Sequence, residues 1–94
     1  MERSSEQSYE EMISKLNQFC SEVEEQCSVL RSAGSDCVDN TENDPVAEKA
    51  AAKIDRCASE ISQNLEEVQN VIRDLKEEME QIRESAAKAD RFDD

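Results

Sequence analysis

The chain has 94 residues, with 24 Asp or Glu against 11 Lys or Arg, so its formal net charge is −13. This length allows one domain, residues 1–94, and 36% hydrophobic with 3% aromatic residues cannot build a large globular core. Because the sequence has no His, no Gly-rich phosphate loop and no G-x-S-x-G motif, we expect no enzymatic activity and no cofactor. The composition indicates an acidic, helical interaction protein.

The first helix is predicted over residues 5–33. Apolar residues recur there every seven positions, with a second alternating row and a third row that widens the stripe. The three rows are Tyr9, Leu16, Val23 and Leu30; Ile13, Cys20 and Cys27; and Met12 and Phe19. Ser4 and Gln7 have the spacing of a capping box, which marks the start of the helix.

Residues 34–44 are the only turn-rich stretch and are predicted to form the loop. Gly34 can adopt the left-handed conformation that ends a helix, while Asp44 and Pro45 suit the N-cap and first position of the next one. The second helix is predicted over residues 45–89, followed by a short acidic tail, 90–94. Its two apolar rows are Ile54, Ile61, Val68, Leu75 and Ile82, and Ala58, Leu65, Ile72, Met79 and Ala86.

These elements predict an all-α fold, an antiparallel, coiled-coil-like two-helix hairpin. If the turn centres near residue 39, Leu75, Met79, Ile82 and Ala86 project beyond the first helix and need a partner. The stripe is also broader than a two-stranded pair can bury, so we expect dimerisation or another helical protein to complete a four-helix bundle. The predicted partner contacts are Tyr9, Leu16, Phe19, Val23, Leu30, Leu65, Ile72, Leu75, Met79 and Ile82.

The four cysteines admit two main interpretations. If they are oxidised, helix geometry excludes Cys20–Cys27 and disfavours Cys20–Cys37, which leaves Cys20–Cys57 across the hairpin and Cys27–Cys37 into the loop. Alternatively, they are free thiols that serve as small buried residues. Zinc is disfavoured, because the sequence has no C-x-x-C pair and no His.

The N-terminus has neither a basic start nor the apolar run of a secretory signal, and no stretch is long enough to span a bilayer. We therefore expect a cytoplasmic protein, with any export following a route that needs no signal peptide. The acidic charge repels nucleic acid, so none is expected as a partner. Mimicry of DNA towards a basic cleft is an alternative, although Lys49, Lys53, Arg56, Arg73, Lys76 and Arg83 interrupt the second helix.

Two long amphipathic helices around a turn at Ser32-Ala33-Gly34-Ser35, in about a hundred acidic residues, resemble the WXG100 (ESAT-6-like) proteins and the small helical partners of LXG toxins in type VII secretion. The likeness covers the whole chain by architecture. The W-x-G tryptophan is replaced by Ser32, and the C-terminal Y-x-x-x-D/E motif is absent, with Phe92 too near the end. The resemblance implies a chaperone-like targeting partner of a secreted effector. A coiled-coil adaptor or oligomerisation module explains the heptads equally well.

Overall fold

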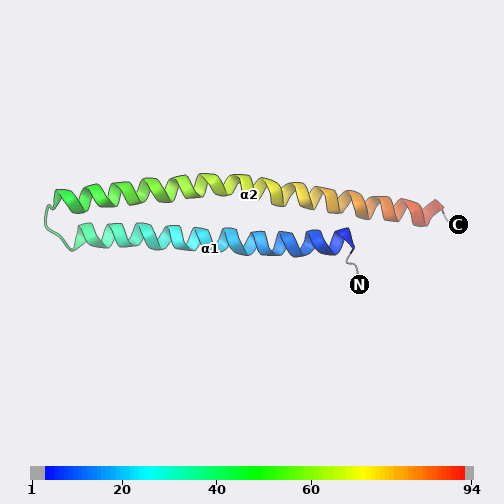
Figure 1. Ribbon diagram of the computed structural model, residues 1–94, viewed down its shortest axis with the longest axis horizontal. Helices are drawn as coiled ribbons and strands as arrows, with labels where there is room; N and C mark the ends of the chain where they lie inside the picture. Colours follow the sequence, from blue (N-terminus) through cyan, green and yellow to red (C-terminus); the bar gives the residue numbers. More distant parts are fainter. Residues whose placement is uncertain (1–3, 93–94) are drawn as a thin grey trace.

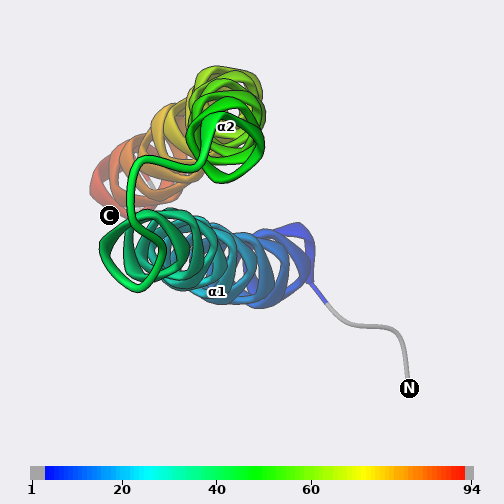
Figure 2. The same cartoon turned by 90° about the vertical axis from the view of Figure 1, so that its left-hand side faces the viewer.

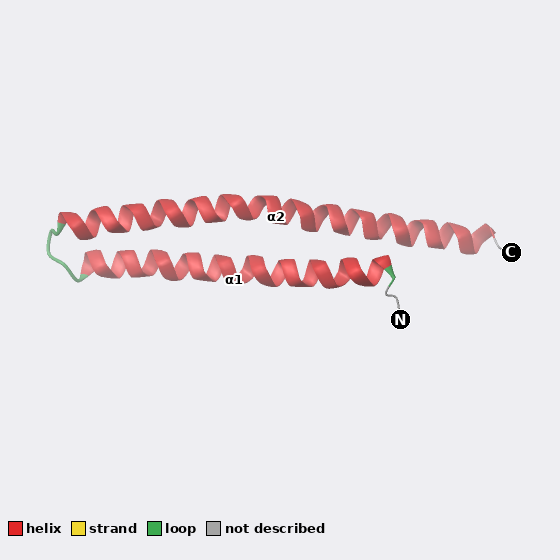
Figure 3. Ribbon diagram, viewed as in Figure 1, coloured by secondary structure: helices red, strands yellow, loops and turns green. Residues whose placement is uncertain are grey.

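The structure is a computed structural model that describes the backbone of residues 4–92 and the side chains of residues 4–89. Two helices, α1 (Ser5–Asp39) and α2 (Pro45–Phe92), form an antiparallel hairpin, which confirms the predicted all-α hairpin (Figures 1 and 3). Seen from the loop, the two helix axes cross rather than run parallel (Figure 2). The molecule is a rod of 78 × 23 × 16 Å with a radius of gyration of 21.7 Å, against about 12 Å for a compact chain of this length.

Both helices begin at the predicted caps. The Ser4 hydroxyl accepts a hydrogen bond from the Gln7 backbone N–H at 3.2 Å, and the Ser4 N–H donates to Gln7 Oε1 at 3.2 Å, a complete capping box. At the start of α2, Asp44 Oδ1 accepts from the N–H groups of Val46, at 2.9 Å, and Ala47, at 3.4 Å. These side chains satisfy helix N–H groups that have no partner within the helix.

The chain reversal lies further along the sequence than predicted. The prediction that Gly34 ends the first helix and opens a loop over 34–44 is wrong, because α1 continues to Asp39. The helix ends where the Asn40 N–H donates to the Asp36 carbonyl at 3.0 Å and the Thr41 hydroxyl donates to the Cys37 carbonyl at 2.9 Å. Asn43, with φ 49°, supplies the left-handed residue of the turn, a conformation that Asn tolerates better than most residues.

Gly34 instead allows the two helices to approach closely. It is buried within α1, and a Cβ placed on it would lie 3.3 Å from Ala51 Cα and 3.4 Å from Ala51 Cβ. A glycine inside a helix costs about 1 kcal/mol relative to alanine, so its presence here is explained by interhelical distance rather than by helix termination.

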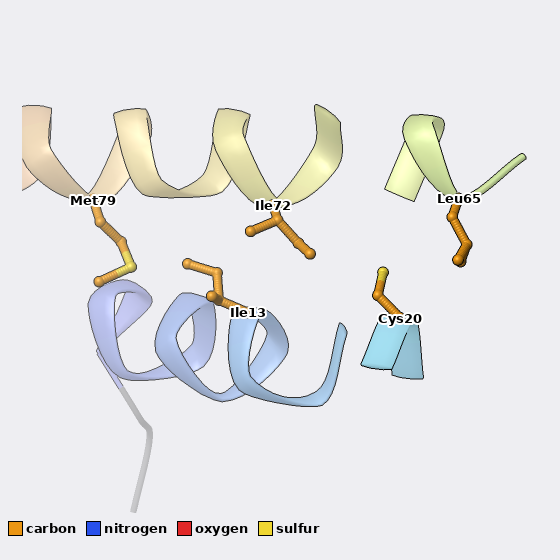
Figure 4. Packing of buried hydrophobic residues seen from close by; sticks show 5 residues of the cluster. All are labelled: Ile13, Cys20, Leu65, Ile72 and Met79. Atoms are coloured by element: carbon orange, nitrogen blue, oxygen red, sulfur yellow. The ribbon is translucent and has the colours of Figure 1, made fainter. Parts of the chain in front are cut away.

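The core is a single line of buried side chains between the helices. It consists of Ile13, Cys20 and Cys27 from α1 and Ala47, Ala58, Leu65, Ile72 and Met79 from α2. Figure 4 shows Ile13 pointing between Ile72 and Met79, with Cys20 directed towards α2 near Leu65. The buried residues are small at the loop end, where Cys27 contacts Ala58, and large at the open end.

The pairing of the helices follows steps of seven residues from the loop. Gly34 lies against Ala51 and the Cys27 thiol donates to the Ala58 carbonyl at 3.7 Å, so each further heptad along α1 corresponds to one along α2. In this pairing the start of α1 lies beside Met79, and the last turns of α2 extend past it (Figure 1).

The predicted exposure of the second helix beyond the first is therefore largely wrong. Met79 is buried, and Leu75 and Ile82 are half-buried, because the later turn brings α1 alongside them. Ala86 is exposed as predicted, and the other apolar residues between 83 and 89 are alanines. This part of the extension thus offers little apolar surface for a partner.

Neither predicted disulfide fits this pairing, and all four cysteines are free. Because Cys27 pairs with Ala58, Cys57 lies opposite residue 28. Cys20 is therefore eight residues, about 12 Å, further along the axis, beyond the ~7 Å limit between bridged Cα atoms. Cys27 and Cys37 belong to one continuous helix, ten residues and about 15 Å apart. The alternative interpretation, with thiols as small core residues, describes Cys20 and Cys27, which are buried, whereas Cys37 and Cys57 are exposed.

Candidate helix-binding surface

One long side of the hairpin, here called the apolar face, is formed by two rows on each helix. They lie three positions after and one position before the central heptad row, which is 6, 13, 20 and 27 in α1 and 51, 58, 65, 72 and 79 in α2. At about 100° per residue, these offsets point to the same side of a helix. None of these residues is buried within the hairpin. The apolar face consists of Tyr9, Met12, Leu16, Phe19, Val23, Gln26 and Leu30 from α1, and Ile54, Cys57, Ile61, Asn64, Val68, Val71, Leu75, Glu78 and Ile82 from α2.

The two helices present these rows to the same side of the molecule. In an antiparallel pair of helices, residues that follow or precede the core residues by the same number of positions lie on the same side of the pair, whichever helix they belong to. Phe19 and Val23 from α1 accordingly line one open groove together with Ile61 and Val68 from α2. Leu30 and Ile61 line its continuation towards the loop. Between Phe19 and Leu30 the face is thus a continuous surface shared by both helices.

The apolar face is unusual in a chain of which 37% is charged. Glu78 is its only charged residue, and Gln26 and Asn64 are its only amides. Its outer side chains are exposed, with Met12 50%, Phe19 49% and Val71 47% accessible, whereas others, such as Leu16 and Val68, are half-buried against the core. Contiguous exposed apolar surface of this kind marks an interaction site, whereas isolated exposed apolar residues are ordinary.

The opposite side, the polar face, holds the interhelical ion pairs. Near the loop, Arg31 Nε donates to Asp55 Oδ1 at 3.1 Å and Arg31 Nη2 donates to Ser59 Oγ at 3.2 Å. At the open end, Arg83 donates from Nε to Glu6 and from Nη2 to Glu10 Oε1, the latter at 3.0 Å. Polar interactions therefore join the helices on one side and leave the other side free of them among the described residues.

The environment of Arg83 favours its charged form. The hydrogen bond from its guanidinium to Glu6, followed by the negative charge of Glu6, raises the pKa of Arg83 above its ordinary value. The guanidinium is solvent-exposed, so its pairs are screened by water and salt and serve mainly to align the first turns of α1 with α2.

The structure separates the predicted contact residues into two groups. Leu65, Ile72 and Met79 are buried between the helices, where they stabilise the hairpin and are not available to a partner of the closed form. The remaining predicted residues lie on the apolar face, namely Tyr9, Leu16, Phe19, Val23, Leu30, Leu75 and Ile82.

The prediction omitted several residues of this face, above all Ile61, Val68 and Val71 of α2. Their heptad positions relative to Leu65 carry the signal: Ile61 and Val68 stand at the same offsets from the core as Val23 and Leu16 in α1. Recognising them requires knowing which apolar row is central in each helix, and that depends on the pairing of the two helices.

Two other kinds of site were searched for in the described part of the chain. The side chains of residues 4–89 include no group of three or more Cys, Asp or Glu placed to hold a metal ion. Neither α1 nor α2, as far as each is described, is long and apolar enough to cross a membrane. Comparison with protein-family models, with curated proteins and with solved structures found no match to this chain.

Proposed function

We propose that this protein is a helix-binding module that buries its apolar face against a helical partner to complete a four-helix bundle. The single observation that supports this most directly is the distribution of charge, because the charged residues crowd the polar face and the outer edges while Glu78 alone interrupts the apolar face. Two helices leave such a face in contact with water, and a second helical layer covers it by ordinary ridge-into-groove packing.

The proposal is tested by photo-crosslinking from both sides of the hairpin in the native cells. A p-benzoylphenylalanine residue in place of Phe19, 49% exposed on the apolar face, is expected to capture one defined helical protein. The same probe in place of Ser62, on the polar face, serves as the matched control and is expected to capture little. Equal capture from both positions, or none from Phe19, would refute the proposal.

Self-association is measured in parallel on the purified chain. Because the hairpin is a rod with a radius of gyration of 21.7 Å, its elution volume alone imitates that of a larger globular protein. Light scattering gives the mass directly. A dimer that Phe19→Gln dissociates, and Ser62→Gln does not, identifies a second copy as the helical partner and favours the oligomerisation module.

More specifically, we propose that the helical partner is an effector of type VII secretion. This proposal rests on the architectural resemblance to WXG100 proteins and LXG partners, which implies the long helices of a secreted effector as the partner. Co-expression with the helical N-terminal segment of such an effector is expected to give a stable complex that Phe19→Gln disrupts. Absence of a complex with effectors encoded beside this protein would leave the helix-binding function standing and remove the link to secretion.

A further inference from the structure

The middle of the hairpin carries charges of one sign only. Between Lys15 and Arg31 on α1, and between Arg56 and Arg73 on α2, every charged residue is a glutamate. We call this segment the acidic belt; its members are Glu22, Glu24, Glu25, Glu60, Glu66 and Glu67. All six are exposed, and none takes part in the ion pairs found among residues 4–92. The belt is about 22 Å long at ~1.5 Å per residue.

The acidic belt flanks the central part of the apolar face. The groove lined by Phe19, Val23, Ile61 and Val68 lies within it. Glu22 lines the continuation of this groove and lies on one edge of the apolar face, two positions after the core residue Cys20. Glu60 and Glu67 lie two positions after core residues of α2, and therefore on the other edge. The apolar groove thus lies between two rows of glutamates.

This arrangement disfavours a second copy of the chain as the occupant. The apolar face runs from Tyr9 to Leu30 on α1, and its midpoint near residue 20 lies inside the acidic belt. Two apolar faces that overlap fully in either two-fold arrangement therefore place one acidic belt upon the other. Glutamates of one copy then oppose glutamates of the other, in a chain that already has a net charge of −13. Like charges held in contact at an interface destabilise it and select against that partner.

We infer that the occupant of the apolar face is a cationic amphipathic helix, with apolar residues along one side and Lys or Arg along both flanks. Its apolar side chains enter the groove between Phe19 and Ile61, and its cations meet Glu22 on one edge and Glu60 and Glu67 on the other. Such flanking charges set partner choice in helical bundles. The inference rests on the proposed function and adds the chemistry of the partner.

The test uses synthetic helices of about three heptads, about 31 Å at ~1.5 Å per residue, which span the belt and extend slightly past both of its ends. The cationic probe has Leu and Ile along one side and Lys on both flanks, the anionic probe has Glu at the Lys positions, and a scrambled probe distributes the same residues as the cationic one around the helix. Binding of each labelled probe to the full chain is measured by fluorescence anisotropy at low and high salt. We expect binding of the cationic probe alone, weakened by salt because screening reduces attraction between exposed charges.

Two matched triple variants separate docking from general attraction to an acidic protein. Glu22→Gln, Glu60→Gln and Glu67→Gln together remove the edges of the apolar face, whereas Glu24→Gln, Glu25→Gln and Glu66→Gln remove the same charge from the other side of the belt. We expect the first triple to weaken the cationic probe on the order of tenfold and the second by less than about threefold. All six positions are exposed and helical, where Gln and Glu have similar helix propensities, so both variants are expected to fold.

The remaining outcomes contradict either the inferred charge of the partner or helix binding itself. Equal binding of the cationic and anionic probes leaves helix binding intact and overturns the inferred charge of the partner. Equal weakening by both triple variants, or equal binding of the scrambled probe, shows nonspecific attraction and also overturns it. A chain that dimerises through Phe19 identifies a second copy as the occupant, and a chain that binds no probe and no copy refutes the proposed function as well.

Discussion

Leu30 and Leu65 allow the distinction between face and core to be measured with the same substitution at two sites. Leu65 is buried, 4% exposed, between the helices, whereas Leu30 is 39% exposed on the apolar face. Leu→Ala removes three carbon atoms, worth about 2.4 kcal/mol when fully buried at ~0.8 kcal/mol each. Leu65→Ala also leaves a cavity, so we expect a loss of about 3 kcal/mol in the free energy of unfolding. Leu30→Ala leaves a gap that water fills, and about 1.5 kcal/mol is expected.

Urea unfolding followed by far-ultraviolet circular dichroism measures both losses, provided that the dependence on denaturant is the same for both variants. Repeating it over a range of protein concentrations reveals any contribution from self-association. Equal losses for Leu30→Ala and Leu65→Ala at every concentration would refute the assignment of Leu30 to a free face. A loss at Leu30 that grows with protein concentration would instead show that a second copy covers the apolar face.

Three further predictions concern the turn, the close approach and the thiols. Asp44→Ala removes the acceptor for two N–H groups at the start of α2 and is expected to lower the free energy of unfolding by about 1 kcal/mol, whereas Asp44→Asn retains most of it. Gly34→Leu drives a side chain into the backbone of α2 and is expected to lower the same quantity by about 1–3 kcal/mol, while Ser35→Leu, on the exposed side, has no such effect; comparable melting temperatures for the two would contradict the close approach. Iodoacetamide is expected to alkylate Cys37 and Cys57 in the folded chain and the two buried thiols only after unfolding, as read by mass spectrometry; a mass that rises on reduction alone would reveal a disulfide instead.

Local signals in the sequence predicted the helices and their starts well. The apolar heptads depend only on residues within one helix, and the caps at Ser4 and Asp44 depend only on neighbours three residues away. The end of α1 was misjudged because glycine has two uses: it permits a left-handed turn, and it also permits close packing. Only the position of Ala51 beside Gly34 decides between them, and that contact is tertiary.

The prediction of the candidate site also depended on where α1 ends. A turn placed a few residues too early shifts the pairing of the helices, and this shift made Met79 a partner contact although it belongs to the core. The same shift placed Cys20 opposite Cys57, when the chain pairs Cys27 with the neighbouring Ala58. Once the central rows are known, the apolar face follows from the sequence by counting offsets along each helix.

The change in size along the core bears on how the hairpin closes. The Cys27–Ala58 contact encloses a segment of 31 residues, and the Arg83–Glu10 contact encloses 73, so closing the longer loop costs roughly 0.8 kcal/mol more in chain entropy. The contacts near the loop, which close the shortest segments of chain, join small residues and bury little apolar surface. The large core residues Ile13, Ile72 and Met79 lie at the open end of the hairpin, far from the loop. We therefore expect closure in one cooperative step rather than gradual zipping from the turn. The free end of the hairpin, ordinarily the first part of such a structure to open, is where this protein places its largest core side chains.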